Sequence, residues 1–101
     1  MDKIDKLRRL RLTDSERLAL DRLIATTKSD SGQAAKAAKF LLAWWNAEEF
    51  GGFDPATLWS VDQEIAQDML TCLEMIRRLG SYPDAVGYEE EFKGVVSRWG
   101  N

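Results

Sequence analysis

Five apolar residues between Ile65 and Leu79 recur at spacings of four, three, four and three, which is the period of one face of an α-helix. The stripe consists of Ile65, Met69, Cys72, Ile76 and Leu79, and Leu70 and Leu73 widen it. The preceding Ser60-Val61-Asp62-Gln63 has the pattern of a capping box, and Gly80 supplies a C-terminal stop. The segment therefore predicts an amphipathic helix that must bury one side against another element.

Helix signals recur along the rest of the chain. Thr13-Asp14-Ser15-Glu16 is a second capping box and predicts a helix that ends near Lys28. Residues 33–50 place apolar side chains almost all the way round a helical wheel, which is typical of a central helix covered by its neighbours. Asp54-Pro55 predicts the start of a short helical turn, and Tyr88, Phe92, Val95 and Trp99 mark one face of a last helix.

No segment shows the sustained alternation of apolar and polar residues that predicts a β-strand, and no Asn-Gly or Asp-Gly hairpin turn is present. The sequence therefore predicts an all-α fold, a single small helical bundle of four to five helices. We expect the bundle to span residues 13–101. Residues 1–12 would form a basic N-terminal arm or a short helix.

Composition limits the kind of protein this can be. A chain of 101 residues fits one domain, and no apolar run approaches the roughly 20 residues of a membrane span. The N-terminal residues lack the apolar core of a signal peptide, and a single cysteine, Cys72, allows no internal disulfide. These features favour a cytoplasmic location. With a net charge of −3, the chain is not typical of a domain that binds nucleic acid directly.

The most unusual segment runs from Ala47 to Asp68, because it holds six carboxylates and no Lys or Arg. Three large aromatic residues are interleaved with the acids, and Trp44-Trp45 comes directly before them. Negative charge gathered beside large rings is what a partner-binding surface needs. The residues that we predict to bind a partner are Trp44, Trp45, Glu48, Glu49, Phe53, Asp54, Trp59 and Asp62.

Two of these assignments have a plain structural alternative. Glu48 and Glu49 close the predicted helix 33–50, where the helix dipole disfavours carboxylates, so the helix could fray and leave both in water. The other interpretation places them beside Trp44 and Trp45 in a recognition surface. Asp62 could serve only the dipole at the start of its helix. If it is buried instead, it needs a donor such as an Arg or an indole N–H.

The carboxylates could in principle bind Mg²⁺ or Ca²⁺, which prefer oxygen ligands. A Mg²⁺-dependent nucleotide hydrolase would then use Glu48, Glu49, Glu64 and Asp68, but their spacing differs from the paired Glu-x-x-Glu and Glu-x-x-Asp motifs of helical pyrophosphohydrolases. The absence of histidine removes most zinc sites and histidine-based acid–base catalysis. Cys72 has no base to activate it and fits a small core residue. We therefore favour a protein without cofactor, metal or catalytic activity.

The first eleven residues carry a net charge of +3 from Lys3, Lys6, Arg8, Arg9 and Arg11 against two aspartates. Such a basic arm is either a solvated end or a docking element for phosphate or an acidic protein face. It could also pair with the acidic segment, within one chain or between two, so a homodimer remains open. A DNA-associated regulator that uses this arm is the third functional hypothesis.

Several strings resemble a known family: Leu41-Leu42-Ala43-Trp44-Trp45-Asn46-Ala47-Glu48-Glu49, Gly51-Gly52-Phe53-Asp54, Leu58-Trp59, Tyr82-Pro83-Asp84 and Gly87-Tyr88. They are similar to a small domain of unknown function found in proteobacterial plasmids, integrative elements and prophages. The resemblance covers about the last two-thirds of the chain and transfers no catalytic role. It implies a mobile genetic element as the setting. The leading hypothesis is therefore a non-enzymatic protein–protein interaction module of such an element, which binds a basic partner. One specific form is an inhibitor of a host defence complex, such as an anti-CRISPR, whose carboxylates imitate phosphates.

Overall fold

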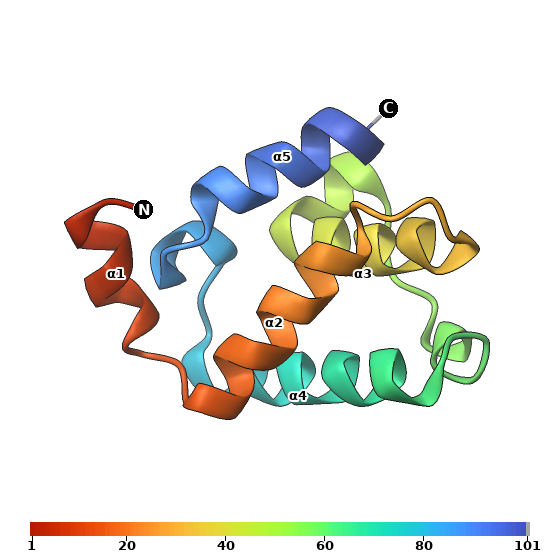
Figure 1. Cartoon of the computed structure of the whole chain (residues 1–101), viewed down its shortest axis with the longest axis horizontal. Coiled ribbons are helices and arrows are strands. Elements are labelled where there is room, and N and C mark those ends of the chain that lie inside the picture. The colour runs from red at the N-terminus through yellow and green to blue at the C-terminus, as the bar shows by residue number, and fades with distance from the viewer. Residues whose placement is uncertain (101) are drawn as a thin grey trace.

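The computed structural model describes residues 1–100 and confirms the all-α prediction, since those residues contain no β-strand. Within these residues, five α-helices and two short 3₁₀ helices follow one another (Figure 1). They are α1 (Lys3–Arg9), α2 (Asp14–Thr26), α3 (Gly32–Phe50), η1 (Pro55–Trp59), α4 (Gln63–Leu79), η2 (Pro83–Val86) and α5 (Glu89–Trp99).

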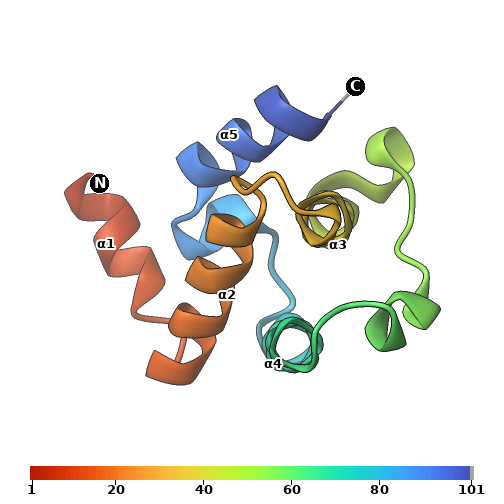
Figure 2. The same cartoon turned by 45° about the vertical axis from the view of Figure 1, so that its right-hand side comes forward.

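Helix α3 packs against α2 and α5, which cover its broad apolar surface from two sides. Helix α2 packs between α3 and α4, and α5 packs across α3 on the other side (Figure 2). Ala34, Ala37, Ala38 and Leu41 are completely or almost completely buried along α3. The three alanines let the neighbouring helices approach closely, while α2, which contacts α3, α4 and α5, connects the helices of the core.

The buried face of α4 differs in part from the predicted stripe. Met69 and Cys72 are fully buried as expected, but Leu70 and Leu73 are exposed by 47% and 39%, and the carboxylate of Asp68 is buried instead. Arg22 of α2 explains the exchange, because its Nε and Nη2 donate to the two Asp68 oxygens at 2.9 and 2.8 Å. A buried carboxylate is tolerated where such a charged donor satisfies both of its oxygens.

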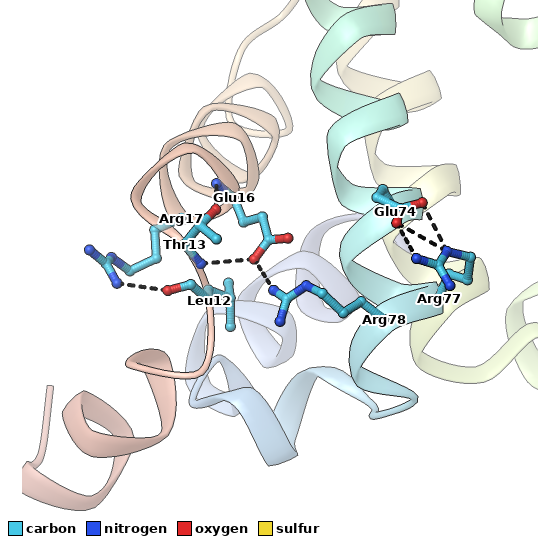
Figure 3. Close-up of polar contacts among 7 residues, drawn as sticks. All are labelled: Leu12, Thr13, Glu16, Arg17, Glu74, Arg77 and Arg78. Carbon is cyan, nitrogen blue, oxygen red and sulfur yellow. Dashed lines mark hydrogen bonds and ion pairs between the residues drawn. The ribbon is translucent and has the colours of Figure 1, made fainter.

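The capping box at the start of α2 forms as predicted and also ties two helices together. Thr13 Oγ1 accepts from Glu16 N at 3.1 Å, and Thr13 N donates to Glu16 Oε1 at 2.8 Å. The same buried carboxylate pairs with Arg78 in the last turn of α4, whereas the neighbouring Arg77 pairs with Glu74 on the outer side of α4 (Figure 3). Glu16 therefore joins the N-terminus of α2 to the C-terminus of α4.

The capping box predicted at Ser60 is wrong. Helix α4 begins after Asp62, whose side chain makes no capping hydrogen bond, while the Ser60 hydroxyl donates to Thr57 O and accepts from Lys36 Nζ. The predicted stop at Gly80 is confirmed, since this residue adopts a left-handed conformation (φ 57°). None of the helices within residues 1–100 has both the length and the hydropathy that crossing a membrane requires.

Candidate partner-binding surface

Helix α3 is interrupted at Asn46, where φ and ψ are −159° and 88°. The Asn46 Oδ1 accepts a hydrogen bond from Glu49 N at 3.1 Å, which is the geometry of an N-cap. Residues 47–50 thus form a new helical turn, and the expectation that Glu48 and Glu49 close a continuous helix is wrong. They lie in the first turn after a cap, where carboxylates are favoured, and both are exposed. The Asn46-x-x-Glu49 spacing is the signal that the sequence analysis missed.

The two adjacent tryptophans both pack on Phe92 of α5. Their ring centroids lie 5.5 Å (Trp44) and 5.6 Å (Trp45) from that of Phe92 in edge-to-face arrangements. Trp44 Nε1 also donates to Ser81 O at 3.0 Å, so this half-buried indole is satisfied within the fold. Trp44 is therefore a structural residue, and Trp45 offers only part of one ring to solvent.

A shallow groove opens where the break in α3 faces α5. Trp45, Phe50 and Val96 form its apolar lining, and Asn46, Glu49 and Lys93 form its polar lining; its volume is about 270 Å³. Ligand pockets usually enclose roughly 300–1,000 Å³ and bury most of their ligand. This open groove falls below that range, and it does not carry a small-molecule site by itself.

The segment from Phe53 to Asp62 divides into a packed part and an exposed part. Phe53 is half-buried, with its ring centroid 5.0 Å from that of Phe40 in an edge-to-face arrangement. Asp54 caps η1, as predicted, by accepting from Ala56 N at 2.9 Å. Trp59 at the end of η1 is 84% exposed, the largest exposed fraction among the large hydrophobic residues of the described chain. Phe53 therefore anchors this segment, and Trp59 projects from it.

The residues Asp54, Trp59 and Asp62 are all exposed and lie around η1; we call them the η1 surface. Two contacts hold this region against the first turns of α3. Asp62 N donates to Gln33 Oε1 at 2.8 Å, and Lys36 Nζ donates to Ser60 O and Oγ at 3.2 and 3.1 Å. Lys36 brings one positive charge to the edge of the surface. Neither Asp54 nor Asp62 forms an ion pair with any residue of the 1–100 range.

The six carboxylates of the acidic segment do not share one environment. Asp68 is neutralised by Arg22, and the charge of Glu64 acts on the same guanidinium, whose pKa is raised chiefly by its hydrogen bonds to Asp68. Glu49 lies beside α5, where it borders the groove near Lys93. Of the predicted partner-binding residues, three on the η1 surface are exposed and lie within one short segment of the chain, while Trp44 and Phe53 serve the core.

The arrangement offers little for metal or thiol chemistry. Across residues 1–100, no three Asp, Glu or Cys side chains come together in a group that could hold a metal ion. Asp68, one of the carboxylates of the hydrolase hypothesis, is engaged by Arg22. Burial, followed by the nearby Asp68 charge, raises the pKa of Cys72 to about 12, so its thiol stays protonated near neutral pH.

The basic arm is a helix whose arginines are used in two ways. Arg9 Nε donates to Gly87 O at 2.9 Å, and its guanidinium lies 3.8 Å from the ring centroid of Tyr88. Its Nη2 is 2.7 Å from Glu91 Oε2, close enough for an ion pair but without hydrogen-bond alignment. Arg11 donates to Ala85 O and to Ser81 Oγ. Arg9 and Arg11 thus attach the arm to the bundle.

The remaining basic side chains of the arm, those of Lys3, Lys6 and Arg8, are exposed. Tyr88 beneath Arg9 donates its hydroxyl proton to Asp21 at 2.8 Å, and burial together with this hydrogen bond raises the pKa of Tyr88. Arg8 also lies 3.8 Å from Asp5 of the same helix, so Lys3 and Lys6 are the cations of the arm without an ion pair within residues 1–100, and Arg9 and Arg11 attach the arm to the bundle.

Comparison with known proteins places these features in a family. Residues 17–100 match a group described as a family of unknown function (DUF7673). The match includes the η1 surface and the break in α3, and it leaves α1 outside. No curated protein and no solved structure matches the chain. Because the match covers most of its length, the chain belongs to the DUF7673 family.

Proposed function

We propose that this protein is a non-enzymatic protein–protein interaction module that binds a basic partner through the η1 surface. The observation that carries the proposal is the 84% exposure of Trp59. The indoles of Trp44 and Trp99 donate to backbone carbonyls, and Trp45 packs on Phe92, whereas Trp59 extends into solvent. Tryptophan is among the residues most enriched at interface hot spots, since one ring removes roughly 150–250 Å² from water.

The charges around Trp59 favour a cationic partner. Asp54 and Asp62 flank the indole in the chain, and each keeps its carboxylate exposed. An Arg or Lys side chain could lie over the indole face, where a cation–π contact contributes about 0.5–2 kcal/mol, while the carboxylates accept its hydrogen bonds. Lys36 at the edge opposes this attraction, so we expect recognition to depend on the ring as well as on charge.

The resemblance to small domains of plasmids, integrative elements and prophages supports a mobile-element setting in the cytoplasm. In that setting the basic partner would belong to a host complex that binds nucleic acid, and the protein would act as an inhibitor of the anti-CRISPR kind. A net charge of −3 is small for a phosphate mimic. The aromatic anchor therefore has to supply a large part of the affinity.

A titration with a hexa-arginine peptide tests the general proposal, because the chain has only four indole N–H signals to follow by NMR. We expect the Trp59 signal to move and those of Trp44 and Trp99 to stay, since these two are hydrogen-bonded inside the fold. The Asp54→Asn/Asp62→Asn variant should weaken peptide binding about tenfold, and added salt should weaken it further. Asn keeps the oxygen that caps η1.

The matched control is Tyr82→Ala, which removes another exposed aromatic ring, 64% accessible, from the segment before η2. It should leave peptide binding unchanged. The proposal fails if the Trp59 signal does not respond to the peptide. It also fails if the two Asp→Asn substitutions leave binding as in the unmodified chain.

The two other functions stay predictions with simple tests. A Mg²⁺-dependent hydrolase requires millimolar Mg²⁺ or Mn²⁺ to raise the melting temperature, since a ligand that binds only the folded state stabilises it. A DNA-associated regulator requires retention on heparin that is lost when Lys3, Lys6 and Arg8 are replaced. Arg9 and Arg11 are unsuited to that test because they hold the arm in place.

A further inference from the structure

Helix α1 faces the bundle with its polar side and turns its apolar side to solvent. Ile4, Leu7 and Leu10 are exposed by 59%, 57% and 70%. The side chains of Asp5 and Arg9, on the opposite side of the helix, are only 14% exposed. An amphipathic helix at a protein surface normally has the reverse orientation. The apolar side of α1 is therefore available for a partner.

Close packing fixes this orientation. A Cβ added at Gly87 would lie 2.4 Å from Asp5 O, so the backbone of α1 rests directly on the turn after η2. Arg9 adds its bond to Gly87 O and its contact with the Tyr88 ring. A rotation of α1 that buried the leucines would break these contacts and expose a buried guanidinium.

The charge around the apolar side limits what can cover it. Lys3, Lys6 and Arg8 are exposed on the same helix. Two α1 helices packed face to face would bring these cations together, and like charges across an interface are unfavourable. The occupant must instead combine apolar surface with negative charge.

The η1 surface has that combination, with an exposed indole and two unpaired carboxylates. Figures 1 and 2 place α1 and η1 at opposite sides of the molecule, and Figure 1 separates them along its longest axis, which extends 35 Å. The two surfaces therefore cannot meet within one chain. We infer that the η1 surface of one copy also binds α1 of a second copy; the inference rests on the proposed function and adds the arm of this same protein to the basic partners of that surface.

The contact rests on few side chains: Ile4, Leu7 and Leu10 with their neighbouring cations on one copy, and Trp59 with Asp54 and Asp62 on the other. Interfaces that bury less than about 1,200 Å² belong to the weak, transient class. The association is therefore in the micromolar-to-millimolar range and falls with ionic strength. One such contact leaves the arm of one copy and the η1 surface of the other unused. These two either bind each other, which gives a closed dimer, or bind further copies, which gives a longer assembly.

Sedimentation velocity of the full chain and two variants tests this pairing. The arm variant is Ile4→Glu/Leu7→Glu, and the acceptor variant is Trp59→Ala/Asp62→Lys; all four side chains are exposed, and circular dichroism checks the fold. The unmodified chain gains mean mass with concentration, and each variant alone associates at least about tenfold more weakly. An equimolar mixture restores association and stops at a heterodimer, because only one intact pair of surfaces remains.

Control variants isolate the cause. Leu70→Ser removes an exposed leucine from α4 and leaves association unchanged. Lys3→Glu/Lys6→Glu keeps the apolar side of α1 and weakens association through charge alone. If the Ile4→Glu/Leu7→Glu variant fails to fold, this second variant still tests whether the arm takes part in association.

Three results would overturn the pairing. An acceptor variant that associates like the unmodified chain, with no rescue on mixing, indicates contact between two α1 helices. A chain that stays monomeric in solution but binds vesicles of anionic phospholipid through Ile4 and Leu7 identifies a lipid surface as the occupant. A chain that stays monomeric while hexa-arginine still moves the Trp59 signal refutes self-association and leaves the proposed function intact.

Discussion

Replacing Gly87 with alanine should detach helix α1 from the bundle. Gly87 has φ +87°, a left-handed conformation that costs a non-glycine residue about 1–2 kcal/mol. The new Cβ would also lie 2.4 Å from Asp5 O and 3.2 Å from Arg8 Cβ. These atoms belong to the body of α1, not to the end of a flexible side chain, so the helix has to move.

The cost of that movement follows from the contacts that it breaks. A displaced α1 loses the hydrogen bond from Arg9 Nε to Gly87 O and the ion pair with Glu91. A hydrogen bond from a charged donor contributes about 1.5–3 kcal/mol. Added to the conformational cost, this gives a loss of about 2.5–5 kcal/mol in the free energy of unfolding for Gly87→Ala.

Two other glycines separate the contributions. Gly80 also has a positive φ (57°), but nothing lies within 4 Å of its added Cβ, so Gly80→Ala should cost only about 1–2 kcal/mol. Gly94 lies inside α5 in open space without a positive φ, and Gly94→Ala should stabilise the protein by about 1 kcal/mol. Urea denaturation of the three variants measures this order.

Hydrogen exchange of the α1 amides in Gly87→Ala, but not in Gly80→Ala, should become fast. In a chain without residues 1–11, the two substitutions should cost the same amount, because the clash no longer exists. Equal costs for Gly80→Ala and Gly87→Ala in the full chain would refute the docking of α1 described above.

Three further predictions concern the interior and the break in α3. Arg22→Ala leaves the buried Asp68 carboxylate without its donor, so it should lower the urea midpoint more than the double variant Arg22→Ala/Asp68→Ala; the opposite order would contradict a buried pair. Burial raises the pKa of Cys72 from 9.0 to about 12, so the folded state holds its thiol proton more tightly than the unfolded state. The contribution of Cys72 to the free energy of unfolding is therefore fully present below pH 9. Above pH 9 the free energy of unfolding should fall by about 1.4 kcal/mol per pH unit up to pH 12. The Cys72→Ala variant lacks this thiol, so its free energy of unfolding should begin to fall at a higher pH. If it falls between pH 9 and 10 as steeply as in the unmodified chain, the result would be inconsistent with a buried thiol. Asn46→Ala removes the cap on Glu49 N and should cost about 1 kcal/mol in thermal unfolding, whereas Asn46→Asp should cost almost nothing.

Local signals predicted much of the secondary structure correctly. The capping box of Thr13 and Glu16, the start at Asp54 and the stop at Gly80 all appear where the sequence places them. Each depends on backbone and side-chain groups within a few residues of one another, so tertiary context has little opportunity to override it. The all-α class followed from the period of the apolar residues for the same reason.

The predictions from local sequence were wrong where a side chain from another helix binds the group in question. Ser60 has the residue type of an N-cap, but Lys36 of α3 and Thr57 O engage its hydroxyl, and α4 begins after Asp62. Leu70 and Leu73 belong to the predicted stripe, yet Arg22 of α2 stabilises Asp68 in the buried face and leaves both leucines exposed. Spacing within one helix cannot reveal a donor that comes from another.

The sequence by itself determined the all-α class, the helix signals at Thr13, Asp54 and Gly80, and the segregation of acidic from basic residues along the chain. Only the tertiary structure decided which sides of those helices face solvent. It packed the partly buried Arg9 and Asp5 of α1 against Gly87 and exposed Ile4, Leu7 and Leu10. It also packed Trp44 and Trp45 on Phe92 and left Trp59 free. A side chain's exposure depends on what packs against it from distant parts of the chain, and that information is not contained in the local pattern.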